Sequence, residues 1–162
     1  LDAAVAATSG QTVHLDESYG HIPAAVSADG VGTPIQTLSI DDAVRGAGLW
    51  DAAPFVLKLD VEGLEIAAYE GAAELRRAHD HALVFEDFAD NDRFGTLRRF
   101  LADGYLAFYA TPTGRAFAVH DVESARRAIA SDPKPGGSRN FVCVLPTSAF
   151  HPTLDAWARG GR

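Results

Sequence analysis

Charged side chains interrupt a segment that otherwise has the pattern of a buried strand. The segment FVLKLDVEGLE, residues 55–65, begins with apolar residues and then places one cation and three carboxylates close together: Lys58, Asp60, Glu62 and Glu65. Alternate side chains of a strand face the same side, so Lys58 and Asp60 are expected on one face of a sheet. A carboxylate can bind a substrate hydroxyl or take its proton. The spacing therefore predicts a ligand site at the end of a strand.

A second strand candidate, ALVFED at 82–87, adds Glu86 to this site. In open parallel sheets, ligands bind outside the carboxyl ends of the strands, where such side chains meet. An isolated buried ammonium costs several kcal/mol even after relaxation, so a buried Lys58 would need Asp60 or Glu86 as its partner. We therefore expect Glu86 to line the predicted site.

The residues after Asp60 are expected to turn the chain into a helix. Gly63 permits a tight turn and close approach of a ligand to the backbone. Glu62 and Glu65 then fall in the first helical turn, where the helix dipole favours anions. A purely structural alternative remains open: an ion pair with dipole-stabilising carboxylates, which for Glu65 is the favoured interpretation.

Local patterns predict the elements that carry these side chains. Short runs rich in β-branched and aromatic residues predict strands at 12–15, 34–38, 55–60, 82–87, 105–110, 115–120 and 141–146. Helical periodicity and capping residues predict helices at 40–47, 64–78, 92–103 and 122–130. Residues 16–33 lack a period and are expected to form a loop.

The order of these elements predicts an α/β fold in a single domain over residues 1–162. Strands and helices alternate across 55–110, which is typical of parallel βαβ units. A Thr-Pro-Thr-Gly turn at 111–114 joins two strand-like runs, so a hairpin should follow. The last strand is expected to add antiparallel at the edge. The sheet should therefore be mostly parallel with antiparallel C-terminal strands.

Composition excludes several classes of function. The net charge of −8 over 162 residues argues against a nucleic-acid partner, which requires clustered Lys and Arg. No apolar run approaches the roughly 20 residues that cross a bilayer, and the first residues lack a secretion signal. The single cysteine, Cys143, has an apolar setting, and a cytoplasmic location is predicted. The run His-Asp-His at 79–81 is expected to end a helix, so no metal site is predicted.

These motifs resemble the FkbM-type methyltransferases. The resemblance covers residues 35–110 and rests on Lys-x-Asp-x-Glu-Gly-x-Glu at 58–65, Gly71–Ala72, Glu86 and Gly104–Tyr105. It implies a Rossmann-like class I methyltransferase sheet, S-adenosylmethionine as cofactor, and O-methylation of a hydroxyl on a small molecule or sugar. Asp60 or Glu62 would orient or deprotonate that hydroxyl. Lys58 would hold the carboxylate in place, and Glu86 and Glu65 would contact the substrate.

Two departures from the family pattern shape this expectation. Phe88 stands where family members usually carry a histidine, so any role of that histidine is absent here. The segment VAATSGQTVHL, residues 5–15, resembles the part of the family that follows its third strand. The family's glycine-rich cofactor loop and N-terminal strands would precede this segment. The chain alone is then expected to bind the cofactor poorly, and an exposed sheet edge could favour a homo-oligomer. The alternatives are a non-catalytic binding or assembly module, an inactive fragment, and an α/β enzyme whose Asp60 and Glu62 bind a metal.

Overall fold

The computed structural model describes residues 2–16, 25–27, 32–61, 63–87, 94–132 and 139–160. The chain divides into two compact units. The first contains Leu1–Ala53 and Asp60–His79, and the second contains Pro54–Leu59 and Asp80–Arg162. The chain passes from the second unit to the first between Leu59 and Asp60, inside the predicted site motif.

The first unit contains a mixed sheet of four strands in the order β1-β4-β2-β3. Its strands are β1 (Ala3–Val5), β2 (Thr12–Asp16), β3 (Ala25–Ser27) and β4 (Thr33–Leu38). β1 runs parallel to β4, whereas β2 is antiparallel to both β3 and β4. The prediction of a loop over 16–33 is wrong at Asp16, at β3 and at Thr33, because strand pairing orders backbone that has no hydrophobic period. Residues 17–24 and 28–31 of this range lie outside the described residues.

Three helices complete the first unit: α1 (Ile40–Gly46), α2 (Glu65–Glu70) and α3 (Ala73–Ala78). Ser39 caps α1, since its side chain accepts a hydrogen bond from the Asp42 N–H. The single helix predicted over 64–78 is instead two, with the break at Gly71 and Ala72. A side chain at position 71 would collide with the Ala6 carbonyl, so a distant part of the chain fixes this break.

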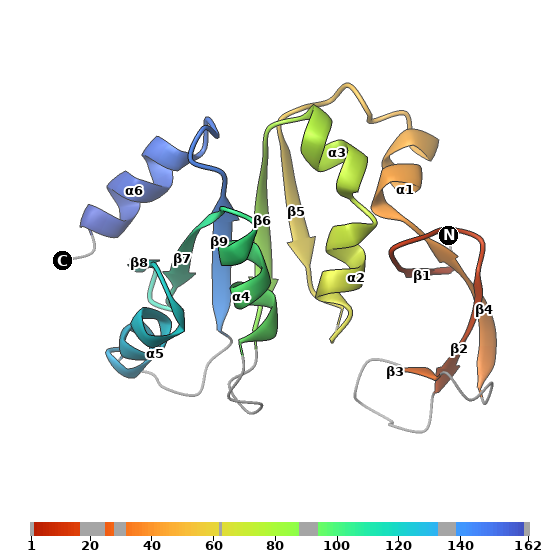
Figure 1. Ribbon diagram of the computed structural model, residues 1–162, viewed down its shortest axis with the longest axis horizontal. Coiled ribbons are helices and arrows are strands. Elements are labelled where there is room, and N and C mark those ends of the chain that lie inside the picture. Colours follow the sequence, from red (N-terminus) through yellow and green to blue (C-terminus); the bar gives the residue numbers. More distant parts are fainter. Residues whose placement is uncertain are drawn as a thin grey trace. The chain divides into compact units, whose positions relative to one another are not determined.

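The second unit contains a mixed sheet of five strands in the order β5-β6-β9-β7-β8. Its strands are β5 (Phe55–Leu59), β6 (His81–Glu86), β7 (Leu106–Ala110), β8 (Ala116–Val119) and β9 (Asn140–Val144). Figure 1 shows β9 between β6 and β7. Only the β5–β6 pair is parallel, and the β6–β9, β7–β9 and β7–β8 pairs are antiparallel.

This topology corrects the prediction of a mostly parallel sheet. The predicted β7–β8 hairpin is confirmed. The last strand is antiparallel as expected, but it lies inside the sheet and separates β6 from β7. Both of its neighbours, β6 and β7, therefore pair with it in antiparallel ladders. Local sequence patterns do not predict such long-range pairing. The fold class shown is α/β with mixed sheets.

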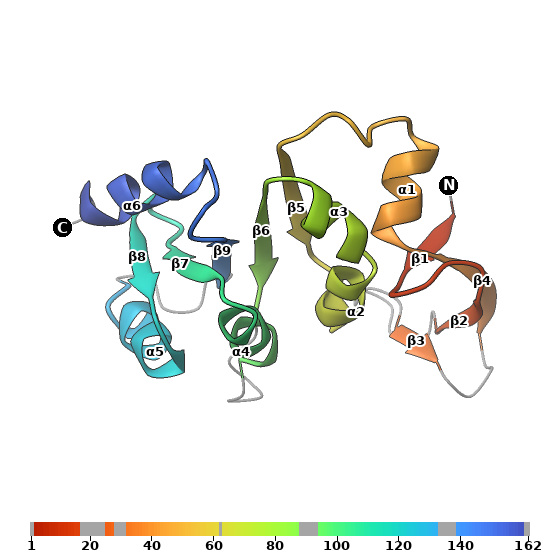
Figure 2. The same cartoon turned by 45° about the horizontal axis from the view of Figure 1, so that its top comes forward.

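Helices cover both faces of the second unit's sheet: α4 (Gly95–Ala102), α5 (Val122–Ala130) and α6 (His151–Gly160). Figure 2 shows α4 and α5 on one side and α6 on the other. An aromatic core fills the α4 side, where Phe85 packs against Phe100 and Phe141 with ring centroids 4.9 and 5.5 Å away.

Within the described residues, no helix has the length and apolar character needed to cross a membrane.

Candidate active site at the end of β5

In the second unit, Lys58 and Glu86 share one face of the sheet. Lys58 lies opposite Val84 in the parallel β5–β6 register, and Glu86 follows Val84 by two residues. Lys58 is exposed and Glu86 is partly buried. The condition under which Lys58 would need a partner, burial of its ammonium group, is therefore not met, and no desolvation cost forces it to have one. Its pairing with Asp60 or Glu86 stays a prediction.

The rest of the motif lies in the first unit, where Asp60 is exposed and Glu65 is buried. Asp60 is exposed and directly follows the last residue of β5. Gly63 has φ of +89°, a left-handed conformation that disfavours other residues, and a Cβ placed there would have no atom within 4 Å. The positive φ confirms the tight turn that the sequence predicted at Gly63, whereas the approach of a ligand stays a prediction. Glu62 lies outside the described residues.

Glu65 is buried at the start of α2, with 7% of its surface exposed. Its Oε1 accepts a hydrogen bond from the Gly63 N–H at 3.1 Å. The carboxylate therefore holds the turn that follows Asp60. This contact accounts for Glu65 without a ligand, which agrees with the structural alternative and leaves its predicted substrate contact untested.

The structure adds two residues that local patterns did not single out. Asn140 lies directly opposite Glu86 in the β6–β9 register. Asp87 is buried, and its Oδ2 accepts a hydrogen bond from the Leu97 N–H of α4 at 3.0 Å. Asp87 thus fixes α4 against the end of β6, whereas Asn140 joins Glu86 on the site's face. No signal in the sequence identifies Asn140, because the insertion of β9 beside β6 is a long-range feature.

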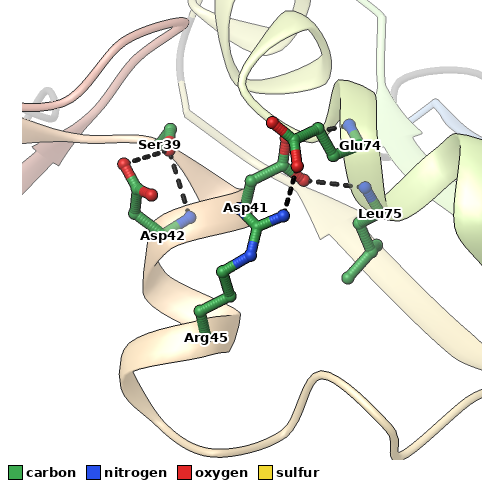
Figure 3. A network of polar contacts seen from close by, with 6 residues as sticks. All are labelled: Ser39, Asp41, Asp42, Arg45, Glu74 and Leu75. Atoms are coloured by element: carbon green, nitrogen blue, oxygen red, sulfur yellow. Dashed lines mark hydrogen bonds and ion pairs between the residues drawn. The ribbon is translucent and has the colours of Figure 1, made fainter.

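A buried carboxylate organises the first unit around α3. Asp41 of α1 has 8% of its surface exposed, and its two oxygens accept hydrogen bonds from the Glu74 and Leu75 N–H groups, both at 2.9 Å. Its own N–H donates to the Gly71 carbonyl at 2.9 Å. Figure 3 shows this carboxylate beside the start of α3, together with the Arg45–Glu74 ion pair. Asp41 therefore satisfies N–H groups of α3 that have no partner within the helix.

Replacing Asp41 with alanine is expected to lower the free energy of unfolding by about 3 kcal/mol, because two charge-assisted hydrogen bonds to buried backbone are lost. Urea denaturation followed by circular dichroism measures this change. The matched control is Asp42→Ala, which removes the next carboxylate along α1. Asp42 is exposed, and its carboxylate accepts hydrogen bonds from the Ser9 and Ser39 hydroxyls. A loss as large in the control would contradict the special role of Asp41.

A second buried polar pair lies in the second unit. The Tyr109 hydroxyl donates a hydrogen bond to Asp132 Oδ2 at 3.0 Å, and the two residues have only 2% and 4% of their surfaces exposed. Burial, followed by the hydrogen bond and the negative charge of Asp132, raises the pKa of Tyr109 from 10 to about 12.

Burial alone raises the pKa of the Cys143 thiol, so that thiol stays protonated and is a poor nucleophile.

The raised pKa of Tyr109 predicts a loss of stability in alkali. The folded state favours the neutral phenol, so this contribution is complete below pH 10 and is lost as the pH rises toward 12. Urea denaturation at pH 9 and pH 11.5 should therefore show a smaller alkaline loss for Tyr109→Phe than for the wild type. Parallel losses in the two proteins would show that Tyr109 does not titrate differently in the folded and unfolded states.

The histidines do not assemble a metal centre in the part of the chain that the structure describes. His81 is buried, with its Nε2 2.6 Å from the Tyr105 hydroxyl. No group of three or more His, Cys, Asp or Glu side chains is arranged to hold a metal ion among the described residues. The alternative of a metal at Asp60 and Glu62 stays open, because Glu62 lies outside that part.

Comparisons with protein family models, with curated proteins and with solved structures found no match for this chain. The class that the fold establishes is an α/β protein with two mixed sheets. The FkbM-type resemblance remains a prediction from residues 35–110.

Proposed function

We propose that the chain belongs to an S-adenosylmethionine-dependent O-methyltransferase of Rossmann-like architecture, and that Asp60 acts on the acceptor hydroxyl. One observation carries the proposal. The FkbM-like motif begins at the carboxyl end of a strand in a parallel pair, and exposed Asp60 and left-handed Gly63 follow at once. That end of parallel strands is where α/β proteins bind small molecules.

The chemistry needs few groups from the protein. S-adenosylmethionine supplies a methyl group on a positively charged sulfur. When bound, it would transfer that methyl group to the acceptor oxygen, and the acceptor hydroxyl would give its proton to a base of the protein. We assign that role to Asp60, with Glu62 as the second carboxylate of the motif. Positioning of the acceptor supplies the rest of the rate enhancement.

The open backbone at Gly63 supports the approach of a ligand to this turn. A Cβ at position 63 would meet no atom within 4 Å, and Glu65 holds the turn through the Gly63 N–H. These residues suit a small molecule that lies against the backbone beside Asp60. From the sequence, Lys58 is expected to hold the carboxylate in place and Glu86 to contact the acceptor, and both roles stay predictions.

Two measurements on the product of the complete coding sequence that contains residues 1–162 test the proposal. Calorimetric titration with S-adenosylhomocysteine should give saturable binding, and incubation with methyl-labelled cofactor and a panel of hydroxyl acceptors should give labelled product. Binding without transfer would favour a non-catalytic module. Absence of both would overturn the proposal.

A further inference from the structure

An apolar groove lies between α6 and the sheet of the second unit, which we call the α6 groove. Val56, Val84 and Val142 line it from neighbouring strands, and Phe150 and Leu154 line it from the α6 side. The register places the three valines in adjacent rows of one face, and Val56 remains 61% exposed. The groove has a volume of about 220 Å³.

The size of the groove decides the kind of occupant. An apolar cavity of about 150 Å³ accommodates benzene, so one of 220 Å³ accommodates a single ring with a short alkyl substituent. A protein partner would need roughly 800 Å² of matching surface on this chain. Among all described residues, however, Leu49 and Val56 are the exposed large hydrophobic side chains, and Val56 alone belongs to this unit. A small molecule therefore fits the groove better than a protein does.

Polar groups lie at one end of the groove on the same face. Glu86 follows Val84 by two residues, Lys58 lies opposite Val84, and Asn140 lies opposite Glu86. Two residues along a strand span about 7 Å, which is close to the length of a substituted ring. Glu86 does not line the groove itself, but it lies two residues beyond the lining residue Val84 on the same face, within reach of a ligand that extends along β6. The face therefore changes from apolar to charged over the length of one small molecule.

We propose that the α6 groove binds a small phenol with a short alkyl substituent, with the ring between α6 and the sheet and the hydroxyl donating to Glu86. The binding itself requires neither cofactor nor turnover, so this proposal and the proposed methyl transfer can fail separately.

Titration of ¹⁵N-labelled protein with 4-ethylphenol, followed by NMR, tests the inference. Saturable shifts are expected in β5, β6, β9 and α6, with a dissociation constant on the order of 1 mM for a ligand of this size. Val56→Asn should weaken binding at least tenfold without loss of core packing, because Val56 is largely exposed. The matched control Leu49→Asn changes a similarly exposed residue of the first unit and should leave binding unchanged.

The role of Glu86 has its own readout. Glu86→Gln should weaken the binding of 4-ethylphenol about fivefold, because the amide oxygen still accepts the hydrogen bond but without the negative charge, and should not change the binding of ethylbenzene. Several results would overturn the inference: no saturable shifts, shifts outside the groove, or equal binding by the Val56 variant. Self-association of the wild type that Val56→Asn abolishes would also overturn it, because a second copy would then cover the groove.

Discussion

Gly71→Ala is expected to lower the free energy of unfolding by about 3 kcal/mol, the upper part of the range for an overpacked site. An alanine Cβ at this position would lie 2.2 Å from the Ala6 carbonyl oxygen. The obstacle is backbone, so no side-chain rotation relieves it. The Gly71 carbonyl also accepts the Asp41 N–H at 2.9 Å, which ties the same point to α1. Urea denaturation measures the loss.

Gly46→Ala is the matched control for this experiment. Gly46 is the last residue of α1, and a Cβ there would have no atom within 4 Å. Alanine should therefore stabilise the protein by up to about 1 kcal/mol, since it has the higher helix propensity. A destabilisation as large as that of Gly71→Ala would show that any added methyl group is harmful, and would remove the argument from close contact.

If the proposed methyl transfer is correct, Asp60→Asn is expected to reduce its rate at least 100-fold, which is the usual minimum for loss of a general base. Asparagine keeps the size of the side chain but cannot take the acceptor proton at neutral pH. Because Asp60 is exposed, the variant should fold as the wild type does. Initial rates with saturating cofactor, together with a denaturation curve, measure both properties.

Asp51→Asn provides the comparison, because Asp51 is another exposed aspartate of the first unit. Its rate should equal that of the wild type. Near-normal turnover of Asp60→Asn would end the assignment of the base to Asp60. Equal losses in the two variants would indicate a general effect of net charge rather than a reaction at Asp60.

Local patterns predicted the elements whose ordering forces are local. Asp121, as a capping residue, predicts a helix at 122–130, and α5 spans Val122–Ala130. Asp121 and Ser124 form a capping box at its start. The turn at 111–114 likewise predicts the hairpin of β7 and β8. In contrast, no local pattern predicted α6, although Phe150 and Leu154 pack against the sheet. Its apolar positions find partners only once the sheet exists.

Only part of the geometry around the predicted site follows from the local sequence, for the same reason. The left-handed turn at Gly63 follows from residue type and position, and the structure has it. The exposure of Lys58 depends on what covers β5, and the position of Asn140 opposite Glu86 depends on where β9 inserts. Both are properties of contacts between segments far apart in the sequence, so a pattern within 11 residues does not specify them.

The position of β9 has a consequence for how the protein is made. β9 is the last strand among the described residues, yet it joins β6 to β7 near the middle of its sheet. During vectorial synthesis on the ribosome, β6 and the β7–β8 hairpin therefore emerge long before the strand that connects them. A nascent chain stopped before Asn140 would present two unpaired strand edges to other nascent chains, so residues 140–144 mark the point at which the sheet can close.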